Sequence, residues 1–290
     1  MPHKYKPIEV QYYQTYYFAN VVDNVLENPQ PYLANLEGFW GDDNYLSLIN
    51  PYQKFSAFHQ FIEYIIRDLL FDQQVNIDLE ERKKTLEDRS FICFPRYKKE
   101  LKTLPIEHAL AAHSITSEGF ELWLKEQKKS FLEVTQDDIY EYYQELQLTE
   151  EFETLITQMI NEVFFLMFVN RGALLRFNDI VSRIIGSRSI TEIPDEVKHL
   201  FTKNGVLKRV NPPKWARRAT FFRDRGRCVL CNCDLSGLLS LQNQNHFDHV
   251  VPLATAGLND VSNLQLLCGS CNTRKSAKKA VTSLKYENWY

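Results

Sequence analysis

Apolar residues recur every three or four positions through most of residues 1–205, and this spacing predicts a largely helical region. The clearest case is the segment 53–74, QKFSAFHQFIEYIIRDLLFDQQ, whose apolar residues share one helix face. Two of the other predicted helices open with a threonine followed by acidic residues, a combination that suits a helix start. These further helices are predicted over 135–146, 149–169 and 172–186.

The pattern is interrupted near residue 207. The segment 208–218, KRVNPPKWARR, contains two consecutive prolines that end any preceding helix. A short helix is then predicted over 214–226, closing at a glycine. We therefore predict two domains, a mainly α-helical domain over 1–206 and a smaller one over 207–290.

The smaller domain has a different periodicity. HFDHVVPL (246–253) alternates and is rich in β-branched residues, and NLQLLC (263–268) is similar, so both predict strands. GSCNTRKSAKKAV (269–281) predicts the start of a helix, which completes a ββα order. Outside this domain, RSFICFPRY (89–97) predicts a short strand, although its Pro95 argues against one. The predicted fold class is α+β, a helical N-terminal domain followed by a small ββα domain.

Charge divides the chain at the same place. The net charge of −3 consists of 14 Lys+Arg against 5 Asp+Glu in residues 201–290, a net of +9, and a net of −12 in residues 1–200. An acidic body with a basic C-terminal region predicts that the latter meets a polyanion.

The content of 44% hydrophobic residues is that of an ordinary globular protein. The longest apolar run falls short of the roughly 18 residues that span a bilayer. The first twenty residues lack the apolar core of a signal peptide. We therefore expect a cytoplasmic protein without a membrane partner.

Five of the six cysteines lie in the last 63 residues. In a reducing compartment, paired cysteines are metal ligands or redox groups more often than disulfides. Two Cys-x-x-Cys pairs can complete one tetrahedral Zn²⁺ site, and we predict zinc at Cys228, Cys231, Cys268 and Cys271. Cys233 is expected to be a bystander and Cys93 a buried thiol. A thiol redox protein is the competing interpretation.

The stretch DHVVPLATAGLNDVSNLQLLCGSCNTRK (248–275) resembles the HNH endonuclease family, and the likeness extends over about residues 214–280. The resemblance implies a ββα-metal finger stabilised by zinc. It implies that His249 is the general base, that Asp248 and Asn272 bind a catalytic Mg²⁺ or Mn²⁺, and that Asn263 braces the loop and orients His249. The last position of the motif is asparagine rather than histidine here, and an amide oxygen suits hard Mg²⁺ well.

Basic residues of this region are candidates for substrate contacts. Lys275, Arg274 and His246 are predicted to contact the nucleic acid, since basic groups give sequence-independent phosphate contacts. For His246 a solvated role stays open. A second basic cluster, either a phosphate-binding surface or a solvated face, consists of Arg217, Arg218, Arg223, Arg225 and Arg227.

The resemblance implies a one-metal endonuclease that hydrolyses DNA, most naturally duplex DNA with RNA left open, to 5′-phosphate and 3′-hydroxyl ends. We expect an anti-phage defence or restriction role, controlled through the N-terminal domain by a protein partner or a homo-oligomer. The alternative is a catalytically weak zinc module that binds nucleic acid or protein.

Overall fold

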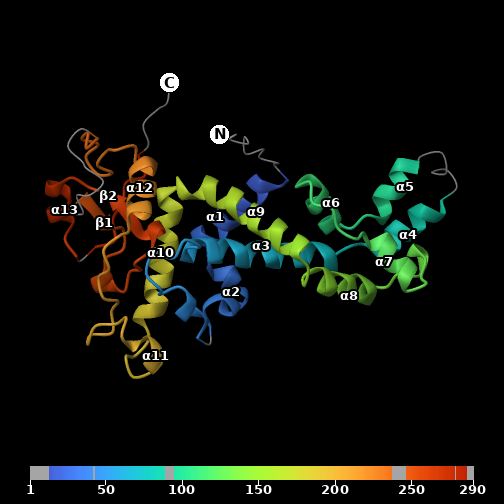
Figure 1. The fold of residues 1–290 in the computed structure, drawn as a ribbon, viewed down its shortest axis with the longest axis horizontal. Coiled ribbons are helices and arrows are strands. Elements are labelled where there is room, and N and C mark those ends of the chain that lie inside the picture. The colour runs from blue at the N-terminus through green and yellow to red at the C-terminus, as the bar shows by residue number, and fades with distance from the viewer. Residues whose placement is uncertain (1–12, 42, 89–94, 237–245, 278, 286–290) are drawn as a thin grey trace, which may run out of the picture. The chain divides into compact units, whose positions relative to one another are not determined.

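The structure, a computed structural model, describes residues 13–41, 43–88, 95–236, 246–277 and 279–285. These parts are mostly helical, with one two-stranded sheet in the C-terminal region (Figure 1). The α-helices are α1 (Thr15–Glu27), α2 (Leu33–Trp40), α3 (Ala57–Val75), α4 (Leu79–Glu87), α5 (Pro95–Lys102), α6 (Pro105–Ala112), α7 (Phe120–Glu126), α8 (Gln136–Leu146), α9 (Glu150–Phe168), α10 (Arg171–Gly186), α11 (Asp195–Lys198), α12 (Lys214–Arg223) and α13 (Gly269–Lys275). The strands are β1 (Phe247–His249) and β2 (Leu264–Leu266). The predicted α+β class, mainly helical with a small C-terminal ββα element, is confirmed.

The chain divides into two compact units. The first comprises Met1–Phe18 and Glu63–Val163, and the second comprises Ala19–Ile62 and Phe164–Tyr290. The second unit thus combines the ββα element with an early stretch of the chain and with α10. The boundary predicted between residues 206 and 207 falls inside this unit, and independent folding of 207–290 stays a prediction.

The helix starts follow from local capping. Thr135 Oγ1 accepts a hydrogen bond from the Asp138 backbone N–H at 3.3 Å, and the Asp138 carboxylate accepts from the Thr135 N–H at 2.8 Å. Thr149 Oγ1 accepts from the Phe152 N–H at 3.2 Å. These bonds satisfy N–H groups that a helix leaves unpaired. The helices predicted over 135–146, 149–169 and 172–186 are confirmed as α8, α9 and α10.

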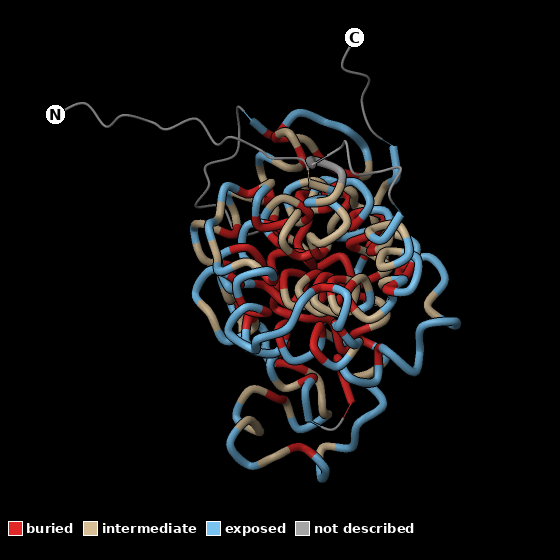
Figure 2. The backbone as a smooth tube through the Cα atoms, turned by 90° about the vertical axis from the view of Figure 1, so that its right-hand side faces the viewer, coloured by how far each residue is buried: buried red, intermediate tan, exposed pale blue. Residues whose placement is uncertain are grey.

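An aromatic core holds α2, the first turns of α3, and α10 together in the second unit. The Phe177 ring centroid lies 5.0 Å from that of Phe58 and 5.3 Å from that of Phe61, and Phe61 lies 5.4 Å from Phe39. Figure 2 shows buried residues, in red, on the inward sides of the helices. The helix predicted over 53–74 is confirmed as α3, although it begins at Ala57.

The ββα element is shorter than predicted in all three parts. β1 ends at His249 although the Val250 N–H still donates in register to the Asn263 carbonyl at 2.6 Å, because the Asn263 N–H donates to the Asp260 carbonyl at 3.0 Å instead of back to Val250. Pro252 then has no N–H to donate. α13 ends at Lys275 because Ser276 has φ +54°, outside the helical range. The order of the elements is as predicted.

The strand predicted over 89–97 is wrong for residues 95–97, which belong to helix α5. α5 begins at Pro95, because proline is favoured in the first turn of a helix. Residues 89–94, which include Cys93, lie outside the described residues.

Within the described parts of the chain, no single helix is long and apolar enough to cross a membrane. The bent pair α9 and α10 passes by length and composition, which is weak evidence, because buried core helices pass the same test.

His59, in the first turn of α3, makes the stability of this core depend on pH. Its ring stacks on Phe164 with centroids 3.5 Å apart, and burial lowers its pKa to about 4. The unfolded chain takes up this proton near pH 6.5, so the stabilisation is complete above pH 6.5 and is lost as the pH falls toward 4. Wild type should lose stability between pH 7 and pH 4, and His59→Gln should lose about 3 kcal/mol less over the same pH change. The unfolding free energies come from chemical denaturation of both proteins at both pH values. An equal loss in the two proteins would contradict the role of His59.

Candidate active site and metal centre

The short hairpin and α13 bring the motif residues together. β1 and β2 pair antiparallel, with Asp248 opposite Gln265 and His249 opposite Leu264. Cys268 caps the start of α13, where its Sγ accepts from the Cys271 N–H at 3.4 Å. The end of β1 and the first turn of α13 therefore supply the side chains of one site.

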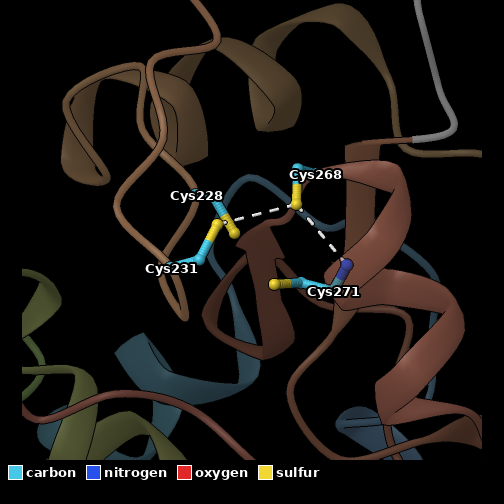
Figure 3. A group of neighbouring side chains, drawn as sticks. All are labelled: Cys228, Cys231, Cys268 and Cys271. Atoms are coloured by element: carbon cyan, nitrogen blue, oxygen red, sulfur yellow. Dashed lines mark hydrogen bonds between the residues drawn. The ribbon is translucent and has the colours of Figure 1, made fainter.

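Four cysteines converge beside this element (Figure 3): Cys228, Cys231, Cys268 and Cys271. Their sulfur atoms all lie within 4.8 Å of one another, and the sulfurs of Cys231 and Cys268 are 3.7 Å apart. Four sulfurs placed tetrahedrally at zinc–thiolate distance lie about 3.8 Å apart. The four cysteines are therefore positioned to bind one zinc ion, as predicted.

The thiols of the cysteine cluster and of the neighbouring Cys233 differ in acidity. The Cys233 backbone N–H donates to Cys231 and lowers the pKa of that thiol to about 6, so one thiolate is available at neutral pH. Burial raises the pKa of Cys271 to about 12, while Arg274 Nη2 donates to its sulfur at 3.1 Å and favours the thiolate. Loss of solvent and the neighbouring Cys231 and Cys268 thiols raise the pKa of Cys233 to about 12. Cys271 has an equally raised pKa, so acidity does not separate the two; among the described residues, Cys233 is not one of the four cysteines that converge.

A cavity of about 460 Å³ is lined by three of the four residues assigned to catalysis, Asp248, His249 and Asn272. Successive residues of a regular strand face opposite sides. Asp248 and His249 reach the same cavity because β1 ends at His249. Arg209 also lines the cavity.

His249 is a buried, neutral imidazole. Burial, together with the charges of Arg209 and Lys275, lowers its pKa to about 3, and a hydrogen bond with Asn259 acts in the opposite direction. Its Nε2 lies 3.5 Å from the Tyr52 hydroxyl, whereas among the described residues its Nδ1 has no hydrogen-bond partner. A buried ring nitrogen without a protein partner is open to a water, an ion or a ligand.

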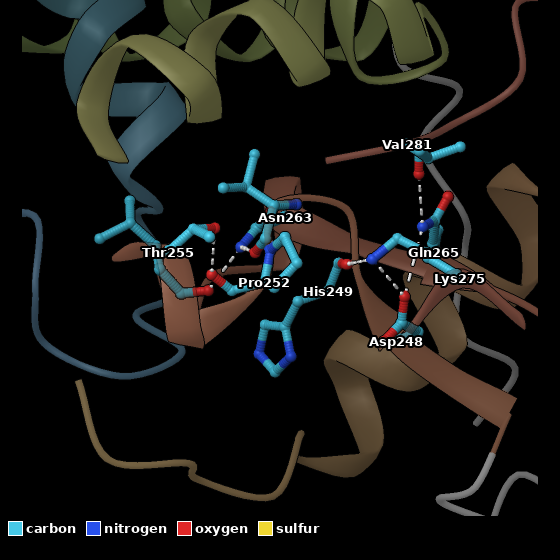
Figure 4. Close-up of polar contacts among 10 residues, drawn as sticks. Asp248, His249, Pro252, Thr255, Asn263, Gln265, Lys275 and Val281 are labelled. Carbon is cyan, nitrogen blue, oxygen red and sulfur yellow. Dashed lines mark hydrogen bonds and ion pairs between the residues drawn. The ribbon is translucent and has the colours of Figure 1, made fainter. Parts of the chain in front are cut away.

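The Asp248 carboxylate is held by an ion pair. Lys275 Nζ lies 2.9 Å from Asp248 Oδ2 and donates to the His249 carbonyl at 2.7 Å (Figure 4). Gln265 Nε2 donates to the same carboxylate oxygen at 3.4 Å and to the Val281 carbonyl at 2.9 Å. The Lys275 side chain is only 1% exposed, so it supports Asp248 and the end of β1. The phosphate contact predicted for Lys275 stays a prediction.

Asn263 is fully buried and braces the loop after β1. Its Nδ2 donates to the carbonyls of Val251 and Leu258, both at 2.9 Å, and its Oδ1 accepts from the Val251 N–H at 2.8 Å. A Cβ at Gly257 would lie 2.1 Å from the Val251 carbonyl oxygen, so this loop needs glycine there. These contacts fix the backbone immediately after His249, in keeping with the bracing role predicted for Asn263.

The other two predicted substrate-binding residues do not line this cavity. His246 Nδ1 donates to the Leu267 carbonyl at 2.9 Å, and the ring is half-buried. Arg274 is exposed and contacts the Cys271 sulfur. Their contacts with nucleic acid stay predictions.

Sequence analysis missed the residues that reach the site from the early part of the chain. Tyr52 packs with Val261 and Leu264, and its N–H donates to the Asn259 carbonyl at 2.8 Å. The buried Asp260 carboxylate accepts from the Ala57 N–H at 3.0 Å, at the start of α3. Tyr52 is about 200 positions from His249 in sequence, so no local pattern pairs them, and no signal in the sequence could have found this contact.

Any catalytic rate that depends on His249 should fall about fivefold in Tyr52→Phe, because losing one hydrogen bond costs about 1 kcal/mol. The ring and its packing stay, so the melting temperature should change little. A turnover rate equal to that of wild type would exclude a role for the hydroxyl.

Comparison with known proteins agrees with this geometry. Residues 228–278 match the model of the HNH endonuclease family. No curated protein and no solved structure matches the chain. The matched range contains both strands, α13 and all four clustered cysteines. Residues 228–278 are therefore similar to HNH endonucleases, and this similarity, with the cysteine cluster, indicates a nuclease-type or nucleic-acid-binding zinc module.

Proposed function

We propose that the HNH domain is a metal-dependent endonuclease that hydrolyses the phosphodiester bonds of DNA. The observation that supports this most is the single cavity lined by Asp248, His249 and Asn272. It combines a base, a carboxylate and an amide, which are the groups that a one-metal hydrolysis needs.

Asp248 and Asn272 suit a hard divalent cation. Both supply oxygen donors to the same cavity, and a carboxylate keeps acceptor sites when one of its oxygens is paired with a lysine. A bound Mg²⁺ or Mn²⁺ would neutralise charge on the phosphate and on the leaving oxygen.

His249 would accept a proton from the attacking water. The water oxygen forms a bond to phosphorus, the bond from phosphorus to the 3′-oxygen breaks, and the departing oxygen takes a proton from solvent. Burial keeps the imidazole neutral and therefore able to accept. Its pKa of about 3 makes it a weak base in the free protein; the negative phosphodiester favours the imidazolium, while a bound divalent cation would act in the opposite direction.

One observation favours the second candidate, a zinc module that binds nucleic acid without cutting it. The Lys275 ammonium 2.9 Å from the Asp248 carboxylate offsets the one acidic charge of the proposed metal site. Such a pair weakens cation binding in the absence of substrate.

Incubation of the full chain with supercoiled plasmid, linear duplex, single-stranded DNA and RNA, with and without added Mg²⁺, separates the two candidates. A nuclease converts at least the DNA substrates to shorter or nicked products in Mg²⁺. Binding of these substrates without any product would establish the zinc module instead. The defence or restriction role, and control by a partner or by oligomerisation, are part of this proposal as its expected biological setting.

A further inference from the structure

A second and larger cavity, of about 770 Å³, lies beside the first zinc knuckle. It shares no lining residue with the cavity of Asp248 and His249. Besides Arg223, four cations from separate parts of the second unit line it: Arg171 at the start of α10, Arg225 and Arg227 after α12, and Lys285 in the C-terminal segment. Its volume is within the range of pockets that hold small ligands or parts of larger ones.

The charged residues that line this cavity are mostly basic, although Arg171 Nη2 also donates to the Lys285 carbonyl and Arg227 lies near enough to Asp234 to lower the pKa of that carboxyl. Asp224 is the one acidic residue among the described residues that line it. Its side chain is fully buried, and its oxygens accept from Arg223 Nε at 2.9 Å and from the Leu266 N–H at 2.9 Å. The Asp224 carboxylate is therefore occupied by contacts that stabilise the fold. The basic residues outnumber it, so the cavity favours the binding of an anion.

The backbone at Arg225 is unusual. Arg225 has φ +57° and Gly226 has φ +65°, both in the left-handed region. Glycine adopts this conformation freely, but arginine does so at a cost. At Gly226, a Cβ would lie 3.0 Å from the Phe221 ring. Asparagine or glycine would be less strained at position 225, yet the chain has an arginine there, and this arginine lines the cavity.

Apolar side chains stand beside the cations. Phe222 is 65% exposed and Val169 is 55% exposed, and both line the cavity. Exposed aromatic rings next to a cationic groove are the combination on which nucleic-acid bases stack while the phosphates are neutralised.

We propose that this cavity binds the phosphates of the nucleic-acid strand on which the HNH domain acts, with Phe222 stacking on a base. This inference rests on the proposed function for its biological meaning. It assigns different roles to residues of the predicted arginine cluster: Arg225 and Arg227 bind phosphate, and Arg223 holds Asp224 and β2.

The test uses the full chain and measures affinity for labelled single-stranded and duplex DNA by fluorescence anisotropy, without added divalent cations and over a series of salt concentrations. The double variant Arg225→Glu/Arg227→Glu should lower DNA affinity at least about tenfold. It should also release about two fewer ions on binding, so that log affinity falls less steeply with log salt concentration.

Phe222→Ala should weaken the binding of single-stranded DNA more than the binding of duplex DNA.

The matched control is Lys203→Glu/Lys214→Glu, which makes the same charge change at exposed positions outside the cavity and outside the arginine cluster. It should alter affinity by less than about threefold, because exposed distant charges are screened. Retained zinc and an unchanged melting temperature show that each variant is folded. Should the glutamate pair fail to fold, Arg225→Ala/Arg227→Ala replaces it, with at least about a threefold loss expected.

Equal losses in the cavity and control variants, or wild-type affinity in the cavity variants, would overturn the inference. The inference would also be overturned if a free nucleoside triphosphate bound to wild type but not to the cavity variant, while both proteins bound DNA with the same affinity. Loss of DNA affinity in the cavity variant, together with a wild type that does not cut DNA in Mg²⁺, supports the cavity assignment and refutes the nuclease. Cutting by wild type, with unchanged affinity in the cavity variants, refutes the cavity assignment alone.

Discussion

His249→Ala should reduce the rate of DNA cleavage by about 10²–10⁴-fold, the contribution of a general base. The imidazole is held at the end of β1 and lines the cavity shared with Asp248 and Asn272. Its removal takes away the proton acceptor but none of the oxygen donors or surrounding cations. DNA affinity should therefore change little, and the loss should appear in the turnover rate.

Because His249 is buried, the alanine also leaves a space, which costs stability. A thermal melt of the variant therefore accompanies the rate measurement, at a temperature where both proteins are folded. His199→Ala is the matched control, since His199 is exposed and lies outside the cavity. Cleavage by the His249 variant at the wild-type rate would remove this residue from the mechanism.

Cys271→Ser should abolish zinc binding and unfold the region around β1, β2 and α13. Cys271 is buried in the apolar cluster with Phe247 and Leu266, and its sulfur is one of the four that converge. Structural zinc contributes apparent binding free energies of about 10–16 kcal/mol in small zinc fingers, so losing one ligand of four destabilises the domain severely.

Elemental analysis of the purified protein should find one zinc per chain in wild type and none in Cys271→Ser. Cys233→Ser is the matched control and should keep its zinc, because Cys233 is outside the converging set. Zinc-free wild type with a reversible disulfide among these cysteines would establish the redox interpretation.

The elements that depend on local chemistry were predictable from the sequence. Thr135 and Thr149 marked helix starts because a hydroxyl caps the N–H groups three residues on, wherever the helix then packs. The two Cys-x-x-Cys pairs were equally informative, since each pair is a compact knuckle. The end of β1 at His249 was not predictable in this way, because it depends on the Asn263 N–H bonding to the Asp260 carbonyl instead of to β1.

The surroundings of the site depend on contacts between distant segments, which periodicity does not encode. Lys275 was predicted only as a contact for nucleic acid, and nothing in the sequence indicated that its Nζ lies 2.9 Å from Asp248 in the buried interior. Tyr52 and the start of α3 belong to an early segment, and their contacts with His249 and Asp260 form only in the folded unit. The roles assigned to Asp248, His249 and Asn272 stay predictions, supported by their shared cavity.

The cleavage rate as a function of Mg²⁺ concentration, for wild type and Asp248→Ala, tests the central proposal most directly. Wild type should cut supercoiled plasmid negligibly without added Mg²⁺ and reach a saturating rate with it. Asp248→Ala removes the acidic ligand, and its cleavage rate should be at least about 100-fold lower at every Mg²⁺ concentration. Even changes to residues that only support metal ligands cost about 10–100-fold in affinity or activity. Asn272→Ala, which removes a neutral ligand, should recover part of its activity in Mn²⁺. Full cutting by Asp248→Ala in Mg²⁺, or wild-type cutting in metal-free buffer, would contradict the one-metal nuclease.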